Sequence, residues 1–323
     1  MPRLLVAGKL HPSGEARITE LRAGGVEVDY VEEISEASFL PYMATADALV
    51  LRTQPLTADT ISKALRLRVV SRHGVGYDAV DVKALNERGI ALTIVGDVNS
   101  VSVAEQAMMF LLAASKRVLR ADRAVRDITQ WGWRNRLEQQ EISGKNLLII
   151  GYGRSGRKLA KMAAGFDMLV RAHDPYLENL GWPNDPVSPV TDLAEGLAWA
   201  DCISVHIPKS DRPILGAEEL ALCKPGVIIA NTARGGVIDE AALAQALVSG
   251  QVGGAGVDVF ETEPPGVDMP LSGCDTALLT PHVAGLTAEA SERMALAALE
   301  NALGFLDGTL DPTLIVNPEA FDG

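Results

Sequence analysis

The sequence contains few cysteines, and they are widely separated. Cys202, Cys223 and Cys274 are the only three among 323 residues, and they form neither a Cys-x-x-Cys pair nor an even-numbered set. A disulfide framework and a cysteine-based metal site are therefore not expected. We predict three small, buried, reduced thiols, which are typical of a reducing cytosol, and no metal site.

An excess of positive charge is also missing. The chain has 29 Lys and Arg against 42 Asp and Glu, and its formal net charge is −13. This balance argues against a nucleic acid or an anionic membrane surface as a partner. It also means that binding of an anion requires a local arginine, because the overall field opposes it.

Long apolar runs and internal repeats are absent as well. The longest apolar stretch, around AMMFLLAAS, falls well short of a membrane span, and the apolar core of MPRLLVAGKL is too short for a signal peptide. Hydrophobic residues make up 47% and charged residues 22% of the chain, which is ordinary globular composition. We therefore expect a soluble, cytoplasmic protein with one large or two ordinary domains.

Short β-rich runs alternate with helical patterns, and this alternation predicts parallel sheets covered by helices on both faces. A long helical pattern over Ser102–Arg126 interrupts the alternation and is apolar on more than one face, which predicts a helix buried against a large body. A final amphipathic helix is expected from Leu286 to about Phe305, and GWPNDPVSPV is expected to be a loop. The first part of the chain is predicted to contain a helix over Thr57–Leu67 and strands at Leu4–Ala7, Val26–Tyr30, Ala48–Leu51, Val69–Ser71 and Ala91–Val95. The second part is predicted to contain strands at Leu147–Ile150, Met168–Ala172, Cys202–His206, Val227–Ala230, Ala255–Val259 and Ala277–Leu279.

The final helix has no sheet of its own left to cover, so we expect it to return to the first α/β unit. The predicted fold is α/β, with two doubly wound parallel-sheet domains. A Rossmann dinucleotide-binding domain, residues 99–286, is inserted into a flavodoxin-like substrate domain made of residues 1–98 and 287–323.

A glycine-rich turn stands at the start of the second unit. GYGRSG provides Gly151, Gly153 and Gly156 directly after the strand NLLII and at the start of a helix. In a dinucleotide site the first glycine makes the turn, the second lets the backbone approach the pyrophosphate, and the third lets helix and strand pack closely. The helix N-terminus supplies free N–H groups and a positive dipole for the phosphates.

An acid follows the next strand. Asp174 lies 18 residues beyond Gly156, where a carboxylate accepts hydrogen bonds from the adenosine ribose. The same charge repels a 2′-phosphate, so NAD is favoured over NADP. Because the basic residues Arg171 and His173 lie nearby, NADP remains the alternative cofactor.

Further polar residues gather at the ends of the predicted strands of the second unit. Ligands of open parallel sheets bind beyond these ends, and two of the five histidines and a glycine-flanked arginine fall there. These residues fit hydride transfer to a 2-oxo acid. Arg234 would grip the substrate carboxylate, and His282 would supply the proton that the developing alkoxide needs. Glu263 would stabilise the imidazolium and hold its orientation.

The motifs also carry a resemblance to a known family. RHGVGYDAVD, NSVSVAE, GYGRSG, SVHIP, NTARGGVID, GVDVFETEP and TPHVAG occur in the order found in the D-isomer-specific 2-hydroxyacid dehydrogenases. That family includes phosphoglycerate dehydrogenases, hydroxypyruvate and glyoxylate reductases and D-lactate dehydrogenases. The resemblance implies Arg234 as the substrate-binding arginine, Glu263 as the partner carboxylate and His282 as the acid/base.

The resemblance implies binding residues too. For the substrate it points to Arg52 and to the Gly74, Val75 and Gly76 turn, whose backbone N–H groups would hold a carboxylate. Family members close a cleft between their domains and are commonly dimers built on the long helix, so we expect a homodimer through the Ser102–Arg126 region, with Trp131 and Trp133 beyond it. The implied NAD contacts are Gly151, Gly153, Arg154, Ser155, Gly156, Asp174, His206, Ile207, Pro208, Thr232, Ala233, Arg234, Asp258, His282 and Gly285.

The exact substrate and two other functions stay open. Gln54 stands where some phosphoglycerate enzymes carry a second cationic residue, and no regulatory domain follows Gly323, so a phosphorylated substrate is disfavoured without being excluded. A non-enzymatic NAD-sensing scaffold, like the corepressors of this fold, would need partner-binding tails, and this sequence ends almost at its last helix. Formate dehydrogenases, a rival branch together with the phosphite dehydrogenases, commonly carry Gln-Pro before the catalytic histidine, whereas this chain has Thr280-Pro281-His282.

Overall fold

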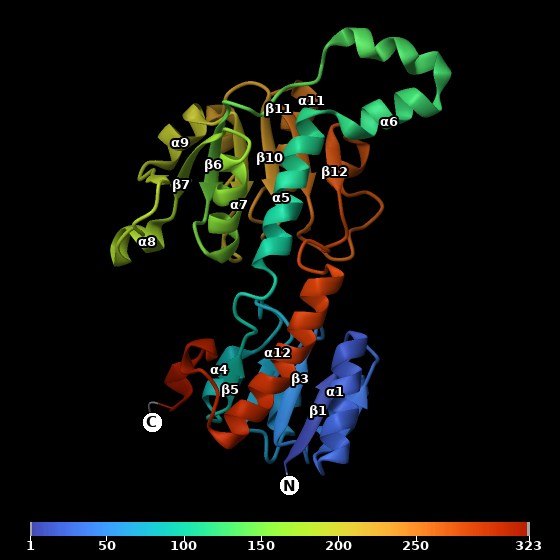
Figure 1. Cartoon of the computed structure of the whole chain (residues 1–323), viewed down its shortest axis with the longest axis vertical. Coiled ribbons are helices and arrows are strands. Elements are labelled where there is room, and N and C mark those ends of the chain that lie inside the picture. The colour runs from blue at the N-terminus through green and yellow to red at the C-terminus, as the bar shows by residue number, and fades with distance from the viewer. Residues whose placement is uncertain (1, 322–323) are drawn as a thin grey trace. The chain divides into compact units, whose positions relative to one another are not determined.

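The computed structural model describes residues 2–321, which form two α/β units. Unit 1 contains the residues up to Asn99 and those from Leu286 onward, and unit 2 is Ser100–Gly285. Each boundary lies one residue away from the predicted one. The last helix, α12 (Ala288–Asp307), packs on strands β3 (Ala48–Leu51) and β4 (Val69–Arg72) and on the first helix, α1 (Pro12–Ala23), as Figure 1 shows.

Unit 1 contains a five-stranded parallel sheet in the order β2-β1-β3-β4-β5, the order of flavodoxin-like folds. Helices α1 and α12 cover one face, and α2, α3 and α4 cover the other. A sheet covered on both faces has no polar side, and all four residues of β3 are accordingly buried. The strands are β1 (Arg3–Ala7), β2 (Glu27–Val31), β3 (Ala48–Leu51), β4 (Val69–Arg72) and β5 (Ala91–Thr93), and the remaining helices are α1 (Pro12–Ala23), α2 (Glu36–Phe39), α3 (Ala58–Ser62) and α4 (Val82–Asn86).

Unit 2 contains a seven-stranded parallel sheet in the order β12-β11-β10-β9-β6-β7-β8, which extends the Rossmann order. Helices α5 and α7 cover one face, and α9, α10 and α11 cover the other. The predicted fold class is thereby confirmed. The strands are β6 (Asn146–Ile150), β7 (Leu169–His173), β8 (Ser188–Pro189), β9 (Cys202–Val205), β10 (Val227–Asn231), β11 (Val252–Val257) and β12 (Ala277–Leu279). The helices are α5 (Ser100–Ser115), α6 (Val118–Arg126), α7 (Arg154–Ala164), α8 (Pro175–Leu180), α9 (Leu193–Trp199), α10 (Ala217–Leu222) and α11 (Glu240–Ser249).

Three predicted elements differ from the structure by more than a shift of their ends, such as that of the strand predicted at Ala255–Val259, which is Val252–Val257. The helix predicted over Ser102–Arg126 is two helices, α5 and α6, because Arg117 between them has a left-handed φ of 53° and its guanidinium donates to the Gly253 carbonyl. The helix predicted over Thr57–Leu67 ends at Ser62, and Leu65 beyond it is exposed rather than part of a buried face. The predicted loop GWPNDPVSPV contains the two-residue strand β8, whose proline is tolerated because the strand lies at the sheet edge.

The cysteines are free thiols in the described chain, but Cys274, which was predicted to be buried, is only partly buried. Cys202 and Cys223 are buried, and burial raises the pKa of their thiols to about 12 and about 11. Both thiols therefore stay protonated and unreactive at neutral pH.

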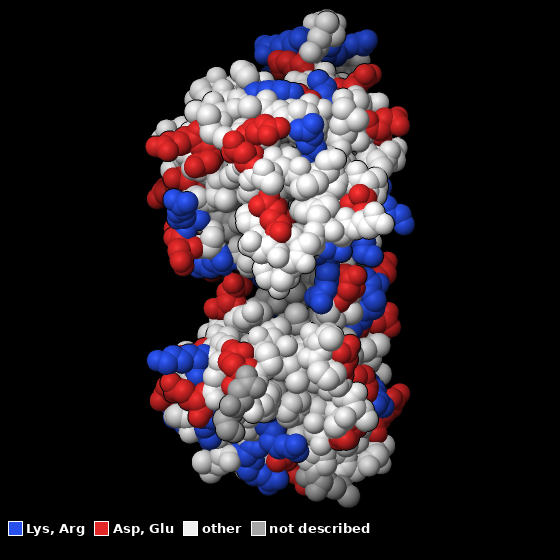
Figure 2. Space-filling model, turned by 90° about the vertical axis from the view of Figure 1, so that its left-hand side faces the viewer, with Lys and Arg blue, Asp and Glu red and all other residues white. Residues whose placement is uncertain are grey.

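The surface carries both signs of charge. Figure 2 shows Lys and Arg interspersed with Asp and Glu over the face that it presents. Over residues 2–321, no helix has the length and apolar character needed to cross a bilayer. The same residues contain no cluster of three His, Cys, Asp or Glu side chains arranged for a metal ion.

Candidate functional site

The predicted site residues of unit 2 lie along one edge of its sheet. All strands of this sheet are parallel, so their carboxyl ends share that edge. In the order of neighbouring strands, Asp174 follows β7, the glycine turn follows β6, His206 follows β9, Thr232–Arg234 follow β10, Asp258 follows β11 and His282 follows β12.

The glycine turn between β6 and α7 requires glycine for two different reasons. Gly151 has a φ of +93°, and a Cβ there would lie 2.7 Å from the His206 carbonyl oxygen. A Cβ at Gly156 would lie 2.4 Å from the Gly151 carbonyl oxygen, so α7 begins in direct backbone contact with the turn. Gly153 is the N-cap of α7, and a Cβ there would meet nothing within 4 Å. The turn is therefore closed toward the protein and open at Gly153, which fits the approach of a pyrophosphate.

Asp174 is fixed by three backbone amides. One carboxylate oxygen accepts from Tyr152 N at 2.8 Å, and the other accepts from Tyr176 N at 3.1 Å and Leu177 N at 3.2 Å. Asp174 thus caps α8 and ties it to the glycine turn. A carboxylate accepts about four hydrogen bonds, so capacity for a ribose hydroxyl remains.

The two basic neighbours of Asp174, on which the NADP alternative rests, make contacts with other residues. His173 is buried, and its Nδ1 lies 2.8 Å from the Val190 carbonyl oxygen. Arg171 stacks on the Trp199 ring, with 4.7 Å from its Cζ to the ring centroid, and lies 3.5 Å from a Glu195 oxygen.

A cluster that the sequence analysis did not identify holds the segment after Asp174. Trp182 stacks on Tyr152 with their ring centroids 5.2 Å apart, and the Tyr152 hydroxyl donates to Asp185 at 2.9 Å. Arg157 also contacts this cluster, with its Cζ 5.5 Å from the Tyr152 ring centroid. Burial raises the pKa of the Tyr152 hydroxyl above its usual range, with the Asp185 contact acting in the same direction. The only sequence signal for this cluster is the aromatic residue inside the glycine motif.

The turn that carries Arg234 is shaped by Asn231 and by two glycines. The Asn231 amide oxygen accepts from Ala233 N at 3.0 Å, and its Nδ2 donates to the Arg234 carbonyl at 3.1 Å. A Cβ at Gly235 would lie only 1.8 Å from the Phe260 carbonyl oxygen, so this turn touches the backbone of the loop that carries Glu263. The Arg234 turn and the Glu263 loop therefore occupy neighbouring strand ends in direct contact.

Thr232 in the same turn has a buried hydroxyl. Only 7% of the residue is exposed, and Oγ1 has no hydrogen-bond partner among the described residues. A buried polar atom without a partner is costly, so this hydroxyl is available to a ligand at the strand ends.

Glu263 and His282 form a hydrogen-bonded pair. The distance from His282 Nδ1 to Glu263 Oε2 is 2.7 Å, and the other carboxylate oxygen accepts from Phe260 N at 3.0 Å. The His282 side chain is 53% exposed and that of Glu263 is 36% exposed, so the imidazole is open to a ligand within this unit. Because Nδ1 faces the carboxylate, Nε2 is the ring nitrogen left for proton exchange.

Asp258 fixes the loop that presents His282. It is fully buried, its carboxylate accepts from Val283 N at 2.9 Å and Ala284 N at 2.8 Å, and it also accepts from the Thr280 hydroxyl. The Asp258 carbonyl accepts from His282 N at 2.8 Å, and His282 has a left-handed φ of 53°. Such a conformation persists only when its surroundings over-determine it, and Asp258 provides those surroundings.

The predicted substrate residues of unit 1 occupy the ends of β3 and β4. Arg52 Nη1 donates to the Lys9 carbonyl at 2.9 Å. The Gly74 amide donates to the Arg72 carbonyl at 2.9 Å, so the expectation that all three amides of the Gly74–Gly76 turn hold a carboxylate is wrong for Gly74. The turn has closed on itself at that residue, and the amides of Val75 and Gly76 have no acceptor among the described residues.

His73 beside this turn was not predicted as a site residue. It is buried, and its Nε2 has no partner among the described residues. Burial, with the nearby Arg52 and Arg72 charges, lowers its pKa to about 4. The imidazole is therefore neutral at physiological pH.

Comparison with known proteins agrees with this geometry. Residues 108–284 match the family model described as "D-isomer specific 2-hydroxyacid dehydrogenase, NAD binding domain". A D-3-phosphoglycerate dehydrogenase of Mycobacterium bovis is 38% identical over 98% of this chain and 59% of its own length. A glyoxylate reductase of Korarchaeum cryptofilum is 34% identical over 97% of this chain and 96% of its own length. The crystal structure of the TT0316 protein from Thermus thermophilus superposes with a TM-score of 0.86 at 32% identity, over 96% of this chain and 98% of that one.

These matches confirm the predicted family resemblance and the expectation of an NAD-type cofactor. This chain spans about three fifths of the phosphoglycerate dehydrogenases that it matches, since 59% of the Mycobacterium bovis relative is covered. The family model ends just after His282 and includes the glycine turn, Asp174 and Arg234. The candidate site of unit 2 therefore lies inside the matched region.

The backbone contact at Gly235 generates a stability prediction. Gly235→Ala would push a Cβ into the Phe260 carbonyl, whereas Gly236→Ala meets no atom within 4 Å and has only a strained φ of +78°. We expect the Gly236 variant to lose about 1 kcal/mol of unfolding free energy and the Gly235 variant several times as much. Urea unfolding of both variants measures the difference, and equal losses would contradict the close approach.

Proposed function

Because this chain belongs to the D-isomer specific 2-hydroxyacid dehydrogenases, we propose that it transfers hydride between a nicotinamide cofactor and a small 2-oxo or D-2-hydroxy acid. The observation that carries the proposal is the Glu263–His282 pair, 2.7 Å apart and open to a ligand, next to the turn of Arg234. The candidate substrates are glyoxylate, hydroxypyruvate and phosphoglycerate-type acids.

In the proposed reaction each side chain has one task. Arg234 binds the substrate carboxylate and polarises the carbonyl, with Arg52 and the amides of Val75 and Gly76 as further substrate-binding groups. A nicotinamide cofactor, when bound, would supply the hydride. His282 holds a proton on Nε2 and releases it to the oxygen that becomes the hydroxyl, while Nδ1–H donates to Glu263. Reduction thus consumes one hydride and one proton, and oxidation returns the proton to Nε2.

The cofactor contacts are proposed at the same sheet edge. The open face at Gly153, the first turn of α7 and the unpartnered Thr232 hydroxyl support a dinucleotide there. Asp174 would accept from the adenosine ribose, and the engagement of His173 and Arg171 elsewhere supports NAD over NADP. The proposed contacts are Gly151, Gly153, Arg154, Ser155, Gly156, Asp174, His206, Ile207, Pro208, Thr232, Ala233, Arg234, Asp258, His282 and Gly285.

The catalytic assignment is tested by substitution. We expect the purified chain to oxidise NADH with at least one of glyoxylate, hydroxypyruvate, pyruvate, phenylpyruvate and phosphohydroxypyruvate. His282→Ala should lower kcat by about 100-fold to 10,000-fold because the proton donor is lost, with NADH affinity retained. Glu263→Gln should lower kcat by a smaller factor, because a neutral amide replaces the carboxylate that holds the imidazole through Nδ1.

Glu261→Gln provides the control, since it removes an exposed acid from the same loop without touching His282. Its kcat should match that of the parent chain. If the chain turns over only formate or phosphite, the proposed substrate class is wrong. Near-parental kcat in His282→Ala would refute the role of that histidine.

The ribose assignment predicts a change in cofactor preference. Asp174→Ala removes the charge that repels a 2′-phosphate, so the ratio of kcat/KM for NADH to that for NADPH should fall by about tenfold or more. The ratio is the proper readout because Asp174 also caps α8. Asp185→Asn, which keeps Asp174, is the matched control, and an unchanged ratio in Asp174→Ala would remove the ribose role.

A homodimer through the α5–α6 region is also proposed. Figure 1 shows α6 and the following 3-10 segment Ile128–Arg136 projecting from the rest of unit 2. Val125 and Ile128 in this projection are 66% and 75% exposed, and Val118, Leu119 and Trp131 are also exposed.

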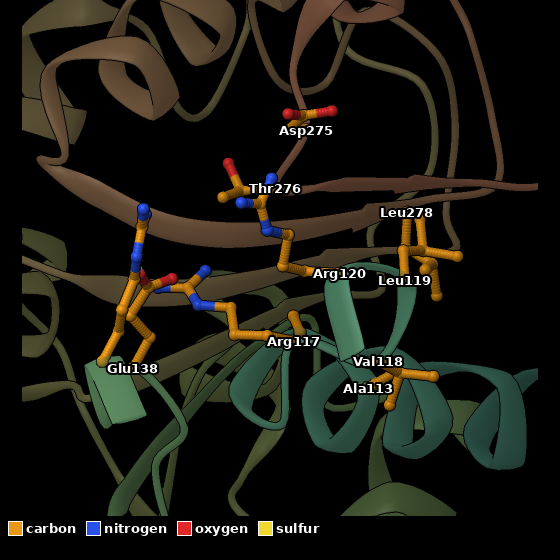
Figure 3. Close-up of a pocket in the computed structure, with 11 residues that line it drawn as sticks. Ala113, Arg117, Val118, Leu119, Arg120, Glu138, Asp275, Thr276 and Leu278 are labelled. Atoms are coloured by element: carbon orange, nitrogen blue, oxygen red, sulfur yellow. Dashed lines mark ion pairs between the residues drawn. The ribbon is translucent and has the colours of Figure 1, made fainter. Parts of the chain in front are cut away.

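Two hollows lie beside this projection. An apolar groove of about 540 Å3 is lined by Met108, Met109, Leu112, Met162 and Phe166, among others. A pocket of about 200 Å3 lies at the α5–α6 junction, where Figure 3 shows Arg120 extending toward Thr276. An exposed apolar projection beside an apolar groove offers both halves of an apolar contact on one surface, which supports a second copy of the chain as the partner.

The dimer is tested at the tip of the projection. Val125→Glu combined with Ile128→Glu places two charges where apolar contacts are proposed, so the mass measured by light scattering should fall to that of one chain. Val248→Glu changes a valine on α11 that is even more exposed, at 82%, and should leave the mass unchanged. A parent chain that is already monomeric would contradict the proposal.

A further inference from the structure

An imidazole at the glycine turn is held between two hydroxyls. His206 Nε2 lies 2.8 Å from the Ser204 Oγ, and its Nδ1 lies 3.1 Å from the Ser155 Oγ. Ser204 is in β9 and is fully buried, whereas Ser155 is half-buried in the first turn of α7. One side chain thus connects the interior of the sheet to the start of the helix.

The ring between the hydroxyls is neutral. Burial lowers the pKa of His206 to about 4, so it carries no charge at physiological pH. A neutral imidazole has one N–H donor and one acceptor nitrogen, and each of its two hydroxyl neighbours must match the role that it faces. The direction of both hydrogen bonds therefore depends on which nitrogen carries the proton.

Ser204 decides between the two tautomers. Its Oγ is buried and contacts no hydrogen-bonding atom other than His206 Nε2 among the described residues. A hydroxyl has a single hydrogen, and burying that hydrogen without an acceptor costs about 1 to 3 kcal/mol. Ser204 must therefore donate to Nε2, which places the ring proton on Nδ1 and makes His206 the donor to Ser155.

This tautomer of His206 also sets the direction of the Ser155 hydroxyl on the open side of the glycine turn. Because Ser155 Oγ accepts from Nδ1, its own hydrogen is left to point elsewhere, and no described residue accepts it. Ser155 is the second residue of α7, whose N-terminus has no side-chain cap. If Nε2 carried the ring proton instead, the Ser155 hydroxyl would donate its hydrogen to Nδ1. Only its lone pairs would then face an anion at the N-terminus of α7.

We propose that Ser204, acting through His206, orients the Ser155 hydroxyl as a donor to a phosphate oxygen of the bound dinucleotide. This proposal rests on the proposed function, since it assumes a dinucleotide at the glycine turn. Ser155 is then a ligand-binding residue, Ser204 is a positioning residue, and the His206 ring connects the two. The arrangement adds a fixed neutral donor to the helix N-terminus in a chain whose net charge of −13 opposes anions.

Binding measurements test the chain of contacts. Ser155→Ala should weaken NADH and ADP-ribose by about tenfold or more, because it removes a hydrogen bond to a charged group, and it should leave adenosine affinity unchanged. Ser204→Ala lets both tautomers form, so the competent fraction falls to about half and Kd for NADH rises about twofold. That twofold effect should vanish in the Ser155→Ala background.

Ser71→Ala is the matched control for loss of a buried strand hydroxyl. Ser71 is fully buried in β4 of unit 1 and donates to the Ala298 carbonyl at 2.8 Å. It should lower thermal stability without changing NADH affinity. A Ser204→Ala effect that persists in the Ser155→Ala background would show a merely structural role and would overturn the proposal.

The tautomer itself is observable without any cofactor. In the 15N-histidine-labelled chain, the signals of His206, identified by their loss in His206→Gln, should show a protonated Nδ1 and a pyridine-like Nε2. Protonation at Nε2 would overturn the inference while leaving the proposed function intact. Failure of the parent chain to bind NADH at all would overturn both.

Discussion

Backbone contact between neighbouring strand ends is the constraint on which the site of unit 2 depends. Gly151 lies against the His206 carbonyl, Gly156 against the Gly151 carbonyl, and Gly235 against the Phe260 carbonyl, each too close for a side chain. These contacts join the ends of β6 and β9 and those of β10 and β11, which are neighbours in the sheet. The sheet therefore positions whole loops against one another, and the reactive side chains depend on that framework.

Within the framework, polar side chains that are buried or half-buried hold backbone groups in place. Asn231 closes the Arg234 turn, Asp258 binds the two amides that follow His282, and Asp174 binds the amide inside the glycine turn. Each of these side chains binds a backbone group for which the loop provides no backbone partner. The exposed pair of Glu263 and His282 rests on these buried contacts, so the rigid part of the site lies beneath the groups that face a ligand.

Much of this could be read from the sequence, because its signals are local. GYGRSG between a strand and a helix, the acid that follows it, and the Arg, Glu and His at strand ends all depend on neighbours within a few residues. The break at Arg117 could not be read, because a carbonyl 136 residues away, that of Gly253, holds its left-handed conformation. Ser204, Trp182 and Asp185 were missed for the same reason: their partners meet only once the register of the sheet is set.

The double attachment of Asp174 has a consequence for how cofactor preference can change. Its carboxylate caps α8 and receives the Tyr152 amide, so the acid that would discriminate between dinucleotides is also part of the local architecture. A mutational route to 2′-phosphate acceptance must then find new acceptors for three amides before it gains a cation. Adding a positive group nearby would leave these three contacts in place, whereas removing the acid would break them.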